Sequence, residues 1–106
     1  MKIGIVISSS DAETIWNAFR FANFSVGEKD EVSVFLIGKG VEYESSSNAQ
    51  FNIIEQAEKL ASNGGKLYAC GTCLKQRNNP GSDICPLSTM QDLYDIVAGS
   101  DKILTF

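Results

Sequence analysis

The sequence predicts an α/β fold of three layers, in which a mostly parallel sheet of four to five strands lies between helices. Apolar runs of strand length alternate with segments whose apolar residues recur at helical spacing. The strand-like runs are almost continuously apolar, as expected for strands buried on both faces of a parallel sheet. The 106 residues suffice for a hydrophobic core, and we expect a single domain over residues 1–106.

Two strands and one helix are predicted in the first part of the chain. Residues 2–8 and 30–38 contain apolar runs rich in β-branched side chains, which favour strands. Between them, Ser10 and Glu13 match a capping box, so we expect Ser10 to be the N-cap of a helix. The positions at which that helix is expected to face the core are Ile15, Ala18, Phe19 and Ala22.

A polar segment, a second helix and a third strand are predicted next. Residues 42–48 are rich in serine and predict a loop. Residues 49–62 have apolar side chains at helical spacing and precede two glycines, which predicts a helix with a glycine stop. Residues 66–70 are a short predicted strand. The second helix is expected to bury Phe51, Ile54, Ala57 and Leu60 or Ala61.

The last quarter of the chain predicts a turn, a helix and a final strand. Residues 78–83 carry the strongest turn signal of the sequence. A second capping box from Ser88 to Gln91 opens a helix that ends at Gly99. Residues 102–106 are the final predicted strand. The last helix is expected to bury Leu93, Ile96 and Val97.

Two cysteines separated by two residues, Cys70 and Cys73, follow the third predicted strand. Cys70 stands at a strand-to-helix junction, where unpaired backbone N–H groups and the positive end of the helical turn favour thiolate over thiol. In parallel sheets, ligands and reactive groups lie beyond the carboxyl ends of the strands. We therefore expect a reactive site that contains both thiols and, from the neighbouring strand ends, Ser9, Ser10 and Gly38.

Three further residues are candidates for this site. Lys75 and Arg77 are either solvated helix charges or cations that lower the pKa of a thiolate and receive an anionic sulfur species. Cys85, which precedes a proline in the loop, is a candidate resolving thiol. Cys73 is either a resolving thiol or a packed core residue, because free cysteine is among the residues most often buried.

Composition and spacing argue against several classes of function. The net charge of −4 argues against a nucleic-acid interface, and no apolar run approaches the roughly 20 residues that span a bilayer. With no histidine and three cysteines, the chain is short of ligands for a zinc site, so we expect neither metal nor cofactor. We expect the protein in the cytoplasm, where thiols are kept reduced.

Two known folds, the thioredoxin fold with its two-cysteine motif and the phosphate-binding flavodoxin fold, fit the sequence poorly. A thioredoxin fold would place its two-cysteine motif after an early strand, whereas here the motif follows the third. Residues 8–10 could cradle a phosphate as in a flavodoxin, but the capping box already accounts for Ser10. Neither fold is therefore our prediction.

The chain resembles the DsrE/DsrF-like family, which includes sulfur-relay subunits of the TusD type. The resemblance is carried by residues 68–77, which hold both cysteines and the basic residues, and by the ending Asp101-Lys102-Ile103-Leu104-Thr105-Phe106. It implies the three-layer fold derived above, with a fifth strand for which Tyr43 and its neighbours are the candidate source. It also implies a homo-oligomer, a trimer or hexamer, with sulfur donor and acceptor proteins as partners.

By this resemblance, Cys70 aligns with the cysteine that carries sulfur as a persulfide in relay members. Our leading hypothesis is a small sulfurtransferase-like carrier in which Cys73, or else Cys85, releases sulfur by forming a disulfide with Cys70. Because Cys73 is not part of the relay pattern, a dithiol redox protein that cycles Cys70 and Cys73 is one alternative. A non-catalytic oligomeric module that binds a small ligand or a partner is the other.

Overall fold

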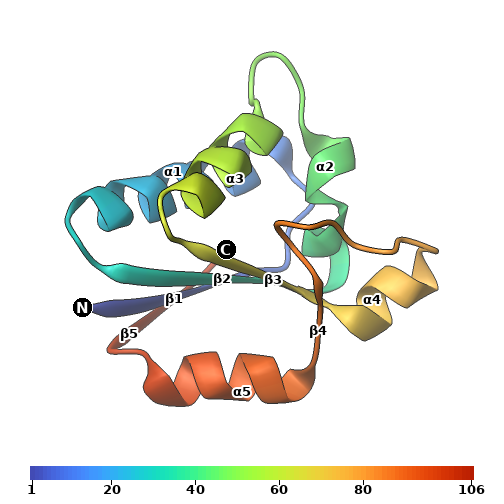
Figure 1. The fold of residues 1–106 in the computed structure, drawn as a ribbon. Helices are drawn as coiled ribbons and strands as arrows, with labels where there is room; N and C mark the ends of the chain where they lie inside the picture. The colour runs from blue at the N-terminus through green and yellow to red at the C-terminus, as the bar shows by residue number, and fades with distance from the viewer.

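The computed structural model describes all 106 residues and has a single five-stranded sheet (Figure 1). The strand order is β4-β3-β2-β1-β5, and every neighbouring pair is parallel. The strands are β1 (Lys2–Ile7), β2 (Glu31–Leu36), β3 (Lys66–Cys70), β4 (Leu87–Ser88) and β5 (Lys102–Thr105). The predicted α/β architecture with a parallel sheet is confirmed.

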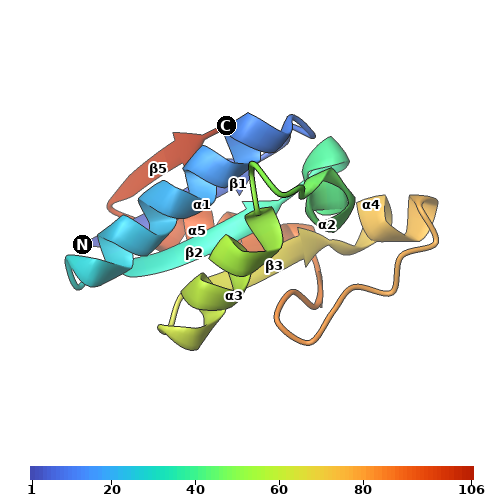
Figure 2. The same ribbon diagram turned by 90° about the horizontal axis from the view of Figure 1, so that it is seen from above.

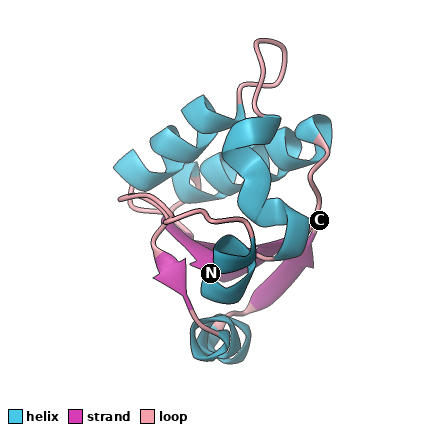
Figure 3. Ribbon diagram, turned by 90° about the vertical axis from the view of Figure 1, so that its right-hand side faces the viewer, coloured by secondary structure: helices cyan, strands magenta, loops and turns pink.

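Helices cover both faces of the sheet. On one face α1 (Ala12–Gly27) and α3 (Ile53–Ser62) lie side by side, with α2 (Tyr43–Ser46) beyond them (Figure 2). On the other face lies α5 (Met90–Gly99), and Figure 3 shows these layers from the side on which α4 lies. The short helix α4 (Gly71–Gln76) continues past the end of β3 (Figure 1). No helix combines the length and the apolar character needed to cross a bilayer.

The core lies between the sheet and the layer formed by α1 and α3. At the centre of the sheet Ile5 is in register with Val34 of β2 and Leu104 of β5. The predicted buried face of α1 is present in full, because each of its four apolar positions is completely buried. A second set of fully buried side chains comes from β1, β2 and α3, and its largest members are Phe35, Ile7, Leu36, Ile53 and Leu60.

The first helix begins one residue later than the sequence predicts. Its N-cap is Asp11, whose carboxylate accepts the backbone N–H of Thr14 at 3.0 Å. Ser10 is exposed and precedes the cap, so the predicted capping box with Ser10 is wrong. Aspartate and serine are about equally good N-caps, and the position of the first turn decided between them.

The last helix is displaced in the same way. Its capping box joins Thr89 and Asp92, which exchange bonds of 3.2 Å and 2.7 Å between backbone N–H and side chain. Ser88, the predicted cap, is instead the last residue of β4, where it is buried. Of the three predicted core positions of α5, Ile96 is buried and Val97 is exposed.

The segment between β2 and α3 differs most from its prediction. A 3₁₀ helix, η1 (Gly38–Glu42), leads directly into α2, where a polar loop is predicted. Tyr43 is buried at the start of α2, so the expected strand around it is wrong, and the fifth strand is β4. Helix α3 begins at Ile53 behind an Asn52 cap, and Ile54 is consequently turned outward.

Candidate functional site

Cys70 and Cys73 occupy the junction between β3 and α4, at the carboxyl edge of the sheet. Cys70 is the last residue of β3 and the N-cap of α4, and it is 5% exposed. Cys73 lies in the first turn of α4 and is partly exposed, and both cysteines are free thiols. Cys70 is the N-cap and Cys73 the third residue of α4, so the two side chains are neighbours in its first turn, and the Cys70 thiol contributes to a raised pKa of Cys73. The motif therefore forms a dithiol pair with one inner and one outer sulfur.

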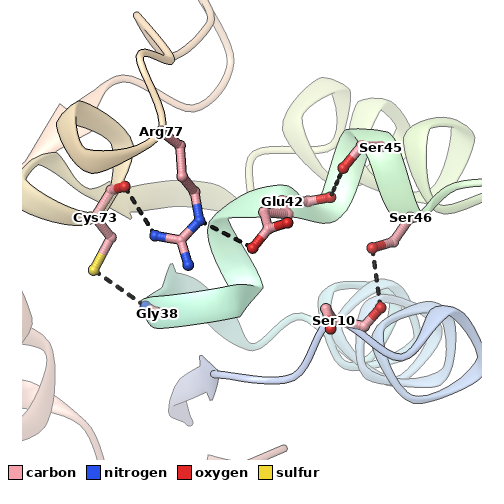
Figure 4. A network of polar contacts seen from close by, with 7 residues as sticks. All are labelled: Ser10, Gly38, Glu42, Ser45, Ser46, Cys73 and Arg77. Carbon is pink, nitrogen blue, oxygen red and sulfur yellow. Dashed lines mark hydrogen bonds and ion pairs between the residues drawn. The ribbon is translucent and has the colours of Figure 1, made fainter.

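The sulfur of Cys73 accepts a hydrogen bond from the end of the neighbouring strand. The backbone N–H of Gly38 donates to Cys73 Sγ at 3.2 Å (Figure 4). Gly38 opens η1 with φ of +57°, a left-handed conformation that favours glycine because it has no Cβ. A backbone N–H aimed at sulfur stabilises negative charge on it.

Arg77 ties α4 to η1 next to this sulfur. Its Nε donates to Glu42 Oε2 at 2.9 Å, and its Nη1 donates to the Cys73 carbonyl at 3.0 Å (Figure 4). The guanidinium is thus held by two acceptors and is not a freely solvated charge. Glu42, which sequence reasoning did not select, is its partner across 35 positions, a separation that no local pattern encodes.

The surroundings of Cys73 shift its thiol pKa in both directions, with an upward result. Burial makes the largest contribution and raises the pKa, and the neighbouring Cys70 raises it further. The Gly38 N–H and the charge of Arg77 lower the pKa, although not enough to reverse the shift. Cys73 is therefore predominantly a thiol at neutral pH, and its thiolate population rises as the pH rises.

The other predicted site residues are distributed over the same edge but not all contact the thiols. Ser9 Oγ accepts the Asp11 N–H at 2.9 Å, and the Ser10 carbonyl accepts the Ser46 hydroxyl at 3.0 Å, so both belong to the start of α1. Lys75 is exposed on α4. Of the supporting residues predicted, the structure brings Gly38 and Arg77 to Cys73.

The third cysteine lies in a separate environment. Cys85 is 2% exposed, and burial, followed by the charge of Glu44, raises its pKa to about 12, while a hydrogen bond with Tyr43 lowers it. These neighbours differ from those of Cys73, which are Cys70, Gly38 and Arg77. No three His, Cys, Asp or Glu side chains converge to hold a metal ion anywhere in the chain.

Comparison with known proteins places the chain in a family. A model of the DsrE/DsrF-like family matches residues 1–106. An uncharacterised protein of Methanocaldococcus jannaschii is 31% identical over the full length of both chains. One of Methanopyrus kandleri is 33% identical over 98% of this chain and 93% of its own.

A solved structure has the same architecture. The crystal structure of the YchN protein from E. coli aligns with a TM-score of 0.84 at 24% identity, covering 100% of this chain and 99% of that one. At this identity the likeness establishes the fold alone. The family model, which covers every residue, establishes the membership: this chain belongs to the DsrE/DsrF-like family.

Proposed function

We propose that this protein is a sulfur carrier that holds sulfane sulfur as a persulfide on Cys70. The observation that carries the proposal is the placement of Cys70 and Cys73 in the first turn after β3, at the carboxyl edge of the sheet, in a chain that matches its family over its whole length. Family membership suggests sulfur relay, and the site offers thiols as its nucleophiles. Because Cys70 is 5% exposed, a persulfide there would be sheltered from bulk solvent.

Loading and delivery are two thiol exchanges. A thiolate of the pair attacks the outer sulfur of a donor persulfide, R–S–SH, the donor leaves as its thiolate, and the sulfur is held on Cys70. An acceptor thiolate then attacks the outer sulfur of Cys70–S–SH and releases Cys70. Alternatively, the Cys73 thiolate attacks the inner sulfur, HS⁻ leaves and a Cys70–Cys73 disulfide forms, which a dithiol reductant must then reduce. In this scheme Arg77 supplies positive potential near the sulfurs and Lys75 attracts anionic sulfur species.

The partners of such a carrier are a sulfur donor protein and a sulfur acceptor protein, and its compartment is the cytoplasm. We further propose that the chain forms a homo-oligomer, a trimer or hexamer. The outward face of α5 supports this assembly, because it carries exposed apolar side chains, which a second copy would cover; they are Met90, Tyr94 and Val97.

A dithiol redox protein is the second candidate function. The neighbouring positions of Cys70 and Cys73 in the first turn of α4 favour it, because two sulfurs at this spacing can close a disulfide by a local rearrangement. In that reaction both thiols lose their hydrogens to an oxidised partner disulfide, which is reduced to two thiols.

Intact-mass measurement separates these functions. The reduced protein, Cys70→Ser and Cys73→Ser are incubated with an inorganic polysulfide, and the mass is recorded. A gain of one sulfur that withstands brief dithiothreitol in the wild type or in Cys73→Ser, and that Cys70→Ser does not retain, is the expected result and supports the carrier. Loss of two hydrogens in the wild type, together with no sulfur gain in Cys73→Ser, supports the redox protein instead. No change in any of the three would contradict both and leave a non-catalytic binding module.

A further inference from the structure

Cys70 and Cys73 differ in how a large donor can reach them. Cys70 is among the buried residues of the core, whereas Cys73, one turn further along α4, is partly exposed. Thiol exchange requires the attacking sulfur to lie along the line of the S–S bond that breaks. A persulfide carried on another protein reaches this alignment with difficulty at a buried sulfur such as Cys70. The geometry thus makes Cys73 the sulfur that a protein donor meets first.

Two groups offset part of the raised pKa of Cys73 by stabilising negative charge on its sulfur. The Gly38 N–H donates to Cys73 Sγ at 3.2 Å, and Arg77 is anchored beside it through Glu42 and the Cys73 carbonyl. A stabilised thiolate is a better leaving group in sulfur exchange. These contacts therefore assist the departure of the Cys73 thiolate when the outer sulfur of Cys73–S–SH passes to Cys70.

The receiving sulfur lies next to it. Cys70 and Cys73 are three residues apart at the start of α4, a spacing that makes side chains neighbours, so transfer between the two needs no rearrangement of the sheet. Sulfur that reaches Cys70 is held by a residue of which 5% is exposed, so it is less accessible to reductants in solution than sulfur on the partly exposed Cys73.

We propose that sulfur enters on Cys73 and then passes to Cys70, so that Cys73 is the entry thiol and Cys70 the storage thiol. This inference rests on the proposed carrier function and specifies its order of events. In the first step the Cys73 thiolate attacks the outer sulfur of R–S–SH, giving Cys73–S–SH and the donor thiolate. In the second step the Cys70 thiolate attacks the outer sulfur of Cys73–S–SH, giving Cys70–S–SH and the Cys73 thiolate. One S–S bond breaks and one forms in each step, the proton of the attacking thiol passes to the sulfur released, and no oxidant or reductant is consumed.

The test compares a protein donor with a small one. Rhodanese charged with thiosulfate serves as the protein persulfide, and inorganic polysulfide serves as the small donor. Loading is stopped at short times with iodoacetamide, and fragmentation of tryptic peptide 67–75 locates the added sulfur on Cys70 or Cys73. Thr72→Ser is the matched control, because Thr72 is an exposed residue in the same turn of α4.

We expect Cys73→Ser, and Cys73→Ala as a second replacement, to slow loading from rhodanese by about tenfold or more while loading from polysulfide changes much less. We expect Cys70→Ser to accept sulfur on Cys73 at the wild-type rate and to lose it faster to brief dithiothreitol. Loading of Cys73→Ser from rhodanese at the wild-type rate, or failure of Cys70→Ser to gain sulfur, would overturn this inference and leave the carrier function standing. If no variant gains sulfur from either donor, the carrier function itself fails, and this inference fails with it.

Discussion

At the scale of single residues, the three thiols of this chain have different chemistry because their immediate neighbours differ. Cys70 is buried at a strand end, and Cys73 is partly exposed and accepts a backbone N–H. Cys85 is packed among core residues, and the groups that act on it are Glu44 and Tyr43. The sequence leaves Cys73 and, behind it, Cys85 as candidates for a resolving thiol, and the structure makes them unlike in exposure and in the groups that act on their pKa.

Cys85 is predicted to be inert towards alkylation in the folded protein. With its pKa raised to about 12, roughly one molecule in ten thousand carries the Cys85 thiolate at pH 8, and burial blocks access to it. We expect iodoacetamide at pH 8 to modify peptide 67–75 while peptide 78–102, which contains Cys85, remains unmodified. Both peptides should react in urea. Equal rates for the two peptides in the folded protein would contradict this assignment.

Replacement of Arg77 by alanine is predicted to raise the pKa of Cys73. The guanidinium lowers that pKa, so its removal disfavours the thiolate and slows alkylation of Cys73 at any pH below the pKa. The loss of the pair with Glu42, whose side chain is substantially exposed, should cost at most about 1 kcal/mol of stability. The measurement is the pH dependence of alkylation in peptide 67–75.

The control for Arg77→Ala is Lys59→Ala, which removes an exposed cation from α3. We expect this variant to titrate like the wild type. A Cys73 pKa that is unchanged or lowered in Arg77→Ala would show that the guanidinium does not act on the sulfur.

At the scale of elements, η1 decides the geometry of the thiol pair. This short helix follows β2 directly and carries both Gly38, which donates to Cys73, and Glu42, which holds Arg77. It can pack against β1 because Gly40 has no side chain: a Cβ there would lie 2.1 Å from the carbonyl oxygen of Ile7. The position of the Gly38 N–H, which donates to Cys73 Sγ, therefore depends on the absence of a side chain at Gly40.

Gly40→Ala is predicted to destabilise the fold by about 2–3 kcal/mol, because the added methyl group overlaps backbone that cannot rotate away. Gly27→Ala is the matched control, since Gly27 ends α1 and a Cβ there meets nothing within 4 Å. We expect the control to be neutral or stabilised by up to about 1 kcal/mol. Urea denaturation measures both, and similar stabilities for the two variants would refute the close contact of η1 with β1.

At the scale of the whole molecule, the parallel sheet brings distant parts of the chain to one edge. Strand β3 lies next to β2, so Cys70 at the end of one strand and Gly38 after the other become neighbours. In the same topology, α5 covers one face of the sheet, and the layer of α1 and α3 covers the opposite face (Figure 1). Helix α5 has exposed apolar side chains on its outward side, and the proposed assembly rests on this feature.

Tyr94→Glu is predicted to convert the proposed homo-oligomer into monomers, because a charge would be buried in an apolar contact. Tyr94 is 67% exposed on α5, and Phe24, also 67% exposed, provides the matched control on α1. We expect Phe24→Glu to keep the wild-type mass in light scattering coupled to size exclusion. A monomeric wild type would contradict the proposed assembly, and dissociation by Phe24→Glu alone would move the interface to α1.

Much of the fold could be predicted from the sequence because it follows from local periodicity. The apolar runs of β1, β2 and β3 and the buried stripe of α1 are patterns within a few neighbouring residues. Short elements escaped prediction for the same reason. Strand β4 has two residues, and it forms because the chain after Pro86 pairs with β3. The sequence contains no apolar run of strand length that would predict it.

The sequence by itself determined that this is an α/β protein and that two cysteines follow the strand 66–70, because both depend on residues adjacent in the chain. Only the tertiary structure decided what each thiol touches. The Gly38–Cys73 and Glu42–Arg77 contacts each join residues 35 positions apart, and they form because β2 and β3 are neighbours in the sheet. Local patterns specify strands and helices but not strand order, and strand order selects the groups that surround a sulfur.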